Sequence, residues 1–196
     1  MRNRNISKMN IKNINIKNTV IIIFLVSALF FPGCLQEIDL EHIDLLTGRE
    51  FYRELVRHID GAGQSIYIIT YYITDYNNRR SPVKRIIDKL AAKQRAGVDV
   101  LVILEGSEEK DCPITQINKK VSKYLLRRGI YVTFDTKYKI THAKIAVIDR
   151  EYVFCGSANL TTAAFYKNQE CAVLLKSKKI AEECLKYFEK LEKYEL

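Results

Sequence analysis

The sequence predicts an α/β domain in which a mostly parallel mixed sheet is flanked by helices. Apolar, β-branched runs at residues 65–74 and 98–105 are too dense to be half exposed, which is typical of central strands. Between such runs lie segments whose apolar residues recur at helical spacing and which close at a glycine, as at Gly97 and Gly129. Strands that alternate with helices in this way favour parallel βαβ units.

Start signals mark the helices in the first half of the domain. Residues 47–50 (TGRE) have the spacing of a capping box, and apolar residues then share one helical face as far as residue 59. Ser81 and Pro82 combine an N-cap with proline at the first helical position. We therefore expect helices that begin after residues 47 and 81, with the strand at 65–74 between them.

The second half of the domain continues the alternation with one exception. An apolar stripe through residues 117–125 predicts a helix, and residues 130–135 predict a third strand. Two apolar runs joined by a polar turn then predict a β-hairpin over residues 144–156, which adds antiparallel pairing to the sheet. A loop or short helix at 160–168, a strand at 169–175 and a last helix complete the domain.

The N-terminus has the pattern of a targeting segment. Residues 1–18 are basic, and residues 20–31 form a nearly unbroken apolar run. That run has the length of a signal-peptide core and falls short of the roughly 20 residues that span a bilayer. We assign residues 1–33 to a signal peptide or an uncleaved signal anchor, 34–46 to a tether and 47–196 to one folded domain. The protein is expected to be exported, either anchored to a membrane or secreted.

Cysteines and charge limit the kinds of site that the domain can hold. Cys34 follows a glycine just after the apolar run, as in a lipoprotein processing site, and is the candidate lipidation site. The other four cysteines show no zinc-binding spacing, which argues against a metal site, and we expect Cys155 and Cys171 to be buried thiols. In an exported domain, one or two disulfides among these four are an open alternative.

The net charge of +9 is unevenly distributed along the chain. Five of the 32 lysine and arginine residues precede Cys34 and none of the 23 acidic residues does, so residues 34–196 keep a net charge of +4. Only a modest excess is therefore left for binding phosphate groups. The basic and aromatic segment 137–139 (KYK) would hold a polyanion by charge and stacking, or is an ordinary solvated loop.

One stretch combines several reactive side chains at fixed spacing. The positions of the pattern HxK(x)4D(x)6GSxN are filled by His142, Lys144, Asp149, Gly156, Ser157 and Asn159. Because His142 and Lys144 are two apart, they would project from the same face of a strand. Asp149 is a catalytic candidate because it belongs to the pattern. Its side chain would point to a different face of the strand from that of His142, however, which favours a structural role.

This pattern resembles the signature of the phospholipase D superfamily. Glu170 falls where members similar to the small bacterial nuclease of that superfamily carry a glutamate. The resemblance covers about residues 47–196, with its specific residues between 142 and 170. It implies a phospholipase D-like α/β sandwich for this catalytic domain, and a reaction that needs neither a metal ion nor a cofactor.

The residues themselves fit phosphodiester chemistry. A neutral His142 imidazole can attack phosphorus, and Glu170 is the candidate carboxylate that fixes its tautomer. Lys144 would bind the phosphoryl oxygens, while Asn159 and Ser157 donate hydrogen bonds to the same group. The expected catalytic step therefore forms a phosphohistidine.

A single signature supplies only one of the two histidines that the reaction uses. In the family, two HxK signatures meet at one site, where one histidine takes the phosphoryl group and the other protonates the leaving group. The remaining histidines of this chain, His42 and His58, lie outside the pattern. The resemblance therefore implies a homodimer in which two copies of His142 share one active site.

Three functions are consistent with these residues. A metal-independent nuclease acting on DNA or RNA is favoured by the size of the domain, the single signature, the export signal and the segment 137–139. A phospholipase D or cardiolipin hydrolase, acting on the membrane that anchors it, is the alternative. A non-catalytic phosphate-binding module is disfavoured, because a binder has no need of the nucleophile.

Overall fold

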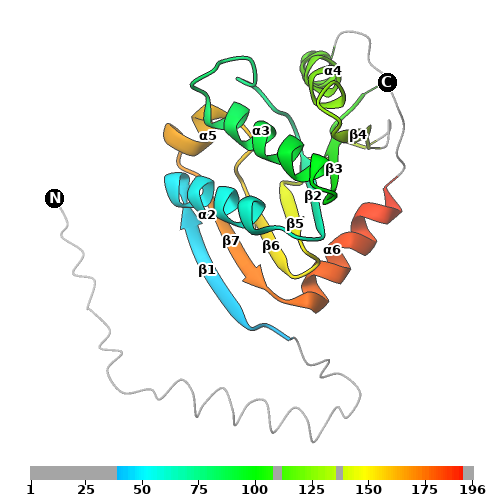
Figure 1. Ribbon diagram of the computed structural model, residues 1–196. Coiled ribbons are helices and arrows are strands. Elements are labelled where there is room, and N and C mark those ends of the chain that lie inside the picture. Colours follow the sequence, from blue (N-terminus) through cyan, green and yellow to red (C-terminus); the bar gives the residue numbers. More distant parts are fainter. Residues whose placement is uncertain (1–38, 108–111, 136–138, 192–196) are drawn as a thin grey trace, which may run out of the picture. The chain divides into compact units, whose positions relative to one another are not determined.

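The computed structural model describes residues 39–107, 112–135 and 139–191 (Figure 1). The predicted targeting segment 1–33, Cys34 and the residues Lys137 and Tyr138 lie outside these ranges. The strands are β1 (His42–Thr47), β2 (Ser65–Thr70), β3 (Asp99–Leu104), β4 (Tyr131–Phe134), β5 (Ile145–Ile148), β6 (Tyr152–Gly156) and β7 (Cys171–Lys176). The helices are α2 (Gly48–Gly61), α3 (Pro82–Arg95), α4 (Pro113–Leu126), α5 (Thr162–Tyr166) and α6 (Lys178–Lys190).

The strands form one mixed sheet in the order β1-β7-β6-β5-β2-β3-β4. The α/β class is confirmed, but the prediction of a mostly parallel sheet is wrong. Among the described strands, parallel pairing is confined to β2–β3 and β3–β4, where α3 and α4 make the crossovers. The turn 149–151 is too short for a crossover, so β5 and β6 pair antiparallel, and β5 also runs antiparallel to β2.

The sheet begins earlier than the sequence predicts. Residues 34–46 were expected to be a tether, whereas residues 42–47 form β1, which pairs with β7 along its whole length, from His42 opposite Lys176 to Thr47 opposite Cys171. As an edge strand, β1 buries little: Ile43 is 55% exposed and Leu45 is 69% exposed. A strand this exposed lacks the dense apolar run that identifies the central strands.

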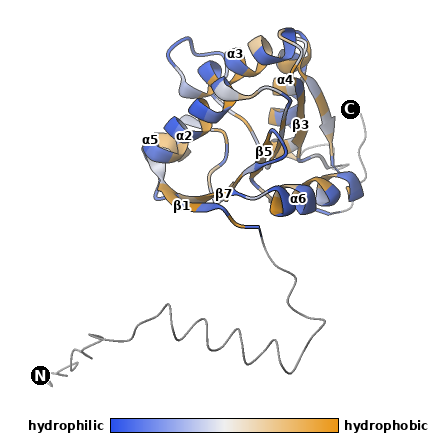
Figure 2. Ribbon diagram, turned by 60° about the horizontal axis from the view of Figure 1, so that its bottom comes forward, coloured by the Kyte–Doolittle hydropathy of each residue, from blue (hydrophilic) through white to orange (hydrophobic). Residues whose placement is uncertain are grey.

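Helices cover the two faces of the sheet unequally. On one face, α2, α3, α4 and α5 pack over the larger core, to which Leu55, Ile86, Val100 and Phe165 belong (Figure 1). On the other face, α6 is the one helix among the described elements, and it packs mainly over β5 and β6. Figure 2 shows bands of hydrophilic and hydrophobic residues along the helices, as expected where each helix has one face on the sheet.

Two cysteines on the face covered by α6 are less buried than the sequence predicts. Cys155 and Cys171 were expected to be buried, but both are exposed, because one helix cannot cover the outward side chains at every strand end. Cys155, Cys171 and Cys184 form no disulfide in the described chain. Within residues 39–107, 112–135 and 139–191, no helix has both the length and the apolar character that crossing a membrane requires.

Capping signals identify the helix starts correctly. Thr47 and Glu50 form the predicted capping box at α2. The Ser81 hydroxyl accepts a hydrogen bond from the backbone N–H of Val83 at 3.0 Å, with Pro82 at the first helical position of α3. The strand predicted at 65–74 is shorter, since β2 ends at Thr70 and the chain then leaves the sheet.

Gly156 allows β6 to lie against β7. A Cβ atom at this position would stand 2.6 Å from both Cα and Cβ of Ala172 and closer still to the carbonyl of Cys171. Strands cannot move apart locally without breaking the β6–β7 pairing, in which Gly156 lies opposite Ala172. Any side chain here would therefore strain the end of β6.

We predict that Gly156→Ala lowers the free energy of unfolding by about 2 kcal/mol or more, because the added methyl group overlaps backbone. Urea unfolding of the two proteins measures the difference. The matched control is Gly61→Ala, where an added Cβ meets nothing within 4 Å. Equal unfolding midpoints for Gly156→Ala and the unchanged protein would contradict the overlap.

Candidate active site

The pairing of the strands brings most of the predicted site residues to one edge of the sheet. At this edge β2, β3, β4 and β6 end, and β5 and β7 begin. The segment with His142 and Lys144 precedes β5, the loop with Ser157 and Asn159 follows β6, and Glu170 precedes β7. Residues far apart in the sequence thus meet where the strands stop.

His142 lies just before β5 and not on a strand, so its placement on a strand face was wrong. Its side chain is exposed, and its ring packs edge-on against Tyr71, with ring centroids 4.7 Å apart. Within the described chain no hydrogen bond engages the imidazole nitrogens. The predicted hydrogen bond between His142 and Glu170 therefore stays a prediction. No described side chain occupies the ring nitrogens that would bind a substrate.

Lys144 is buried beneath His142. Its side chain is 8% exposed, and its ammonium group donates a hydrogen bond of 2.6 Å to the carbonyl oxygen of His142. It also lies over the Tyr71 ring, 5.4 Å from the centroid. A cavity of about 20 Å³, lined mostly by apolar side chains, adjoins it. Burial lowers the pKa of Lys144, and the negative charge of Glu170 opposes that shift.

Glu170 and Ser157 form a polar pair at the start of β7. The Ser157 hydroxyl donates to the Glu170 carboxylate, which also accepts a 2.9 Å hydrogen bond from the side-chain amide of Asn168. The same hydroxyl accepts from the backbone N–H of Cys171 at 3.2 Å. Ser157 therefore holds Glu170 in place, and its predicted role as a phosphate donor competes with this contact.

Asn159 has an unsatisfied polar atom at this edge. Its side-chain oxygen is buried, and no hydrogen-bond donor reaches it from the described residues. Leaving a buried acceptor unpaired costs free energy, and such groups concentrate at functional sites. The unpaired atom is an acceptor, so the predicted donation from the Asn159 amide nitrogen to a phosphoryl group stays a prediction.

Asp149 lies at the opposite end of β5 from Lys144. It has a positive φ of 53° in the turn between β5 and β6. Its carboxylate accepts hydrogen bonds of 2.8–3.1 Å from the backbone N–H groups of Gly63, Gln64 and Ser65. Burial alone would raise the pKa of Asp149, but these three donors lower it. The geometry gives Asp149 a structural contact and no place at the edge that holds His142.

Two carboxyl groups at the edge were not singled out from the sequence. Glu105 directly follows β3 and Asp135 directly follows β4. The backbone N–H of Thr141 donates to Glu105 at 2.6 Å, and that of Gly106 donates to Asp135 at 3.0 Å. Burial raises the pKa of Glu105 to about 7, with the charge of Asp135 adding to the shift, and burial also raises the pKa of Asp135.

Tyr71 and Asn118 were also missed. The side-chain amide of Asn118, on α4, donates 2.8 Å hydrogen bonds to the carbonyl oxygens of both Tyr71 and Glu105. It therefore joins the ends of β2 and β3 below the His142 ring. The signal that could have identified Glu105 and Asp135 is their position immediately after predicted strands, where ligand sites of α/β domains lie.

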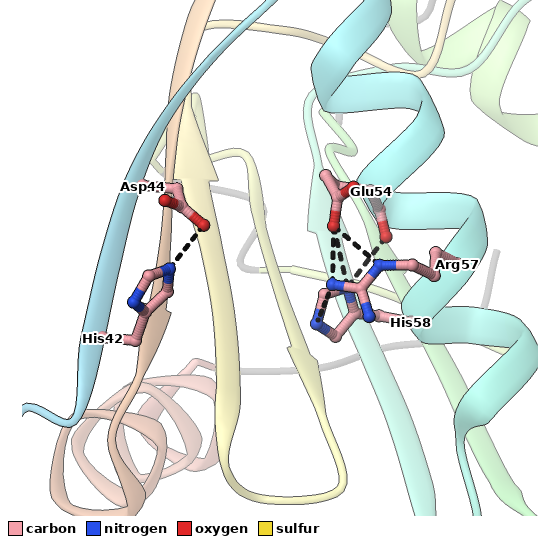
Figure 3. Close-up of polar contacts among 5 residues, drawn as sticks. All are labelled: His42, Asp44, Glu54, Arg57 and His58. Carbon is pink, nitrogen blue, oxygen red and sulfur yellow. Dashed lines mark hydrogen bonds and ion pairs between the residues drawn. The ribbon is translucent and has the colours of Figure 1, made fainter.

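The other two histidines are held elsewhere (Figure 3). His42, on β1, pairs with Asp44 at 2.7 Å. His58, on α2, is 8% exposed and its Nδ1 donates to the backbone carbonyl of Glu54 at 2.9 Å. Burial lowers the pKa of His58. Neither histidine lies at the edge that holds His142.

The described part of the edge holds side chains that suit an anionic group. Within the described residues, no three His, Cys, Asp or Glu side chains gather as metal ligands would. An exposed imidazole and a buried ammonium group are of the kinds that attack and neutralise a phosphoryl group.

Comparisons with known sequences agree with this chemistry. A family model described as "Cardiolipin synthase, PLD-like domain" matches residues 55–192. A phospholipase D of Rickettsia prowazekii is 33% identical over 133 residues, which cover 67% of this chain and 57% of that protein. A phospholipase D of Rickettsia felis is 32% identical over the same length and is covered to 58%. The chain thus spans a little more than half the length of these relatives.

Solved structures share the fold. Nuc from Salmonella typhimurium, a phospholipase D family member, matches with a TM-score of 0.61 at 25% identity, over 79% of this chain and 100% of that chain. NucT from Helicobacter pylori matches with a TM-score of 0.57 at 21% identity, over 76% of this chain and 94% of that chain. The described domain therefore corresponds to the whole of the Nuc chain.

We predict that Asp149→Ala lowers the free energy of unfolding at pH 7 by about 1–3 kcal/mol, because three backbone N–H groups lose a charged acceptor. Since the pKa of Asp149 is lowered in the folded state, its stabilisation is present above the unfolded pKa of about 3.9 and is lost as the pH falls further. Denaturant unfolding between pH 7 and pH 3 measures this.

The control is Asp60→Ala, which removes a surface ion pair with Lys89 and should cost less than about 1 kcal/mol. A cost of Asp149→Ala that stayed constant down to pH 3 would refute the charge-dependent role.

Proposed function

Because the chain belongs to the phospholipase D-like family, we propose that it is a phosphodiesterase that acts through a phosphohistidine on His142, with nucleic acid as substrate. Its fold is the phospholipase D-like α/β sandwich, matching that of Nuc. The observation that carries the proposal is the pairing of an exposed His142 ring with the buried ammonium group of Lys144 at one edge of the sheet.

The reaction divides into two displacements. A ring nitrogen of His142 forms a bond to phosphorus as the bond from phosphorus to the leaving oxygen breaks, and that oxygen takes a proton from a second histidine. Water then attacks phosphorus, the second histidine takes the water's proton, and the nitrogen–phosphorus bond breaks. No oxidant or metal ion is needed to balance either step.

Lys144 supplies the positive charge for both displacements. Its ammonium group has three N–H donors, and one of them is used by the carbonyl of His142. The other donors can reach phosphoryl oxygens, whose negative charge counteracts the effect of burial on the Lys144 pKa. Glu170 assists by keeping a negative charge near Lys144 while Ser157 holds it in position.

The second histidine comes from a second copy of the chain. Since His42 and His58 are engaged away from the edge, His142 is the histidine that lies there. A homodimer with two His142 rings facing each other across a twofold axis supplies both the nucleophile and the acid. The exposure of His142 is what such an arrangement requires of the single chain.

Basic side chains beside the edge support a nucleic-acid substrate. Lys139 is exposed three residues before His142, and Arg79 and Arg80 are exposed on the loop after β2. That loop lies against the one that carries Asn159, through a 3.2 Å hydrogen bond from the Thr74 N–H to the Leu160 carbonyl. Such cations would bind phosphates along a strand.

A phospholipid substrate is the second candidate. It is supported by the relatives named phospholipase D and by Ile140, which is 73% exposed two residues before His142 and would meet an apolar surface. Export and attachment to a membrane through residues 1–34 would place such an enzyme at its substrate. A non-catalytic phosphate-binding module is disfavoured, because it would not need His142.

We predict that the 196-residue chain, assayed in EDTA against DNA, RNA and phospholipid vesicles, cleaves nucleic acid. His142→Ala should lower the rate by about 10³-fold or more, because the nucleophile is lost. His42→Ala is the matched control and should keep full activity. Affinity for nucleic acid should fall steeply with added salt. Cleavage of vesicles alone would favour the phospholipase, and cleavage of nothing would favour the binding module.

The shared site makes a separate prediction about mixtures. His142→Ala and Lys144→Ala proteins should each be inactive. A mixture that exchanges subunits should also stay inactive, because in a mixed dimer one subunit lacks His142 and the other lacks Lys144. Light scattering would establish that the variants remain dimers. Recovery of full activity in the mixture would contradict a site built from both copies.

A further inference from the structure

Glu105 and Asp135 form a buried carboxyl pair next to the catalytic segment. They follow β3 and β4, which are neighbouring parallel strands paired from Leu101 opposite Tyr131 to Leu104 opposite Phe134. Glu105 is 3% exposed and Asp135 is 0% exposed. Because β3 and β4 are paired up to Leu104 and Phe134, the residues that follow them are neighbours, and, beyond burial, the charge of Asp135 helps to raise the pKa of Glu105.

When both carboxyl groups are ionised, one of their oxygen atoms has no hydrogen-bond donor. Asp135 Oδ1 accepts from the N–H of Gly106, but Asp135 Oδ2 is buried without a donor. Two carboxylates cannot hydrogen-bond to each other, whereas one proton between them satisfies both. Among residues 39–107, 112–135 and 139–191, no lysine, arginine or histidine side chain pairs with either carboxyl group, so that part of the chain supplies no cation to offset two negative charges.

The pair is connected to His142 through one backbone amide. Glu105 Oε2 accepts from the N–H of Thr141, the residue that precedes His142, at 2.6 Å. The Thr141 hydroxyl lies beside the Asp135 carboxyl group. Thr141 is 6% exposed, so a shift of either carboxyl group moves a packed segment.

Among the described residues, two other titratable groups lie near the pair. Tyr71, after β2, faces Glu105, and its pKa is raised by burial with the charge of Glu105 contributing. Cys112, at the start of α4, faces Tyr71. Because its pKa is raised, Tyr71 stays neutral near pH 7 and supplies no charge that opposes those of the pair.

We propose that Glu105 and Asp135 share a single proton and, as that unit, position the backbone before His142 for attack on phosphorus. This proposal rests on the proposed function for its catalytic part. The singly protonated pair satisfies Thr141, Gly106 and Asp135 Oδ2 together. Loss of the shared proton places two like charges side by side in a buried site, and their repulsion releases Thr141 and with it the His142 ring. Glu105 and Asp135 are thus positioning residues.

The shared proton also couples stability to pH. The pKa of Glu105 is raised from 4.5 to about 7, so the folded protein binds more protons than the unfolded chain between these values. Stability contributed by the pair is therefore complete below about pH 4.5 and is lost as the pH rises towards 7. Glu105→Gln keeps an acceptor for Thr141 and an N–H for Asp135, without a titrating group.

The test uses Glu105→Gln and Glu105→Ala in the 196-residue chain, with Glu182→Gln on the exposed face of α6 as the control. Melting temperatures are measured from pH 5 to pH 8. Between pH 5 and pH 8, the melting temperatures of the unchanged protein and of Glu182→Gln should fall by about 3 °C or more beyond any fall in the melting temperature of Glu105→Gln. An equal pH dependence in all three proteins would overturn the shared proton.

The catalytic part is tested with bis(p-nitrophenyl) phosphate at pH 6. Glu105→Gln should keep kcat within about threefold, because the Thr141 acceptor remains, whereas Glu105→Ala should lose about tenfold or more in kcat with little change in KM. Equal losses in the two folded variants would overturn the positioning role. If the unchanged protein cleaves no phosphodiester, the proposed function fails, while the melting temperatures still decide the shared proton.

Discussion

The pairing of β5 with β2 is the constraint on which the site depends. Ile145 lies opposite Ile69, so the segment that precedes β5 meets the residues that follow β2. This places His142 against Tyr71 and Lys144 beneath both. A slip of one residue would turn every side chain of β5 to the other face, so the packing of Val147 against α6 and of Ala146 and Ile148 against the larger core fixes the register.

The same edge concentrates polar groups that a stable core would avoid. Lys144, Glu105 and Asp135 are all nearly inaccessible, and the oxygen of Asn159 is buried without a donor. Each costs free energy through desolvation. The two hydrophobic cores on either side of the sheet stabilise the domain against this cost, and the polar groups gain fixed positions in return. Preorganised charges of this kind act most strongly where water is excluded.

Local signals in the sequence predicted what local physics determines. The capping box at Thr47, the Ser81–Pro82 start and the turn at 149–151 each specify an element without help from the rest of the chain. Strands that are not joined by a tight turn have no such local signal, which is why the antiparallel pairings β1–β7, β2–β5 and β6–β7 were missed while the hairpin β5–β6 was predicted. Glu105 and Asp135 each look like the first residue of a polar loop, and only the pairing of β3 with β4 brings them together.

The exposure of His142 and the burial of Lys144 fit a site that one chain does not complete. Lys144 as a residue is 8% exposed, so its side chain has already lost much of its hydration and further exclusion of water costs it little. An exposed imidazole keeps its hydration until a partner or substrate covers it. A second copy placed over this edge would therefore desolvate mainly the two imidazoles. In the proposed dimer, the electrostatic part of the site would be built within each chain, and proton transfer would depend on the assembly of two.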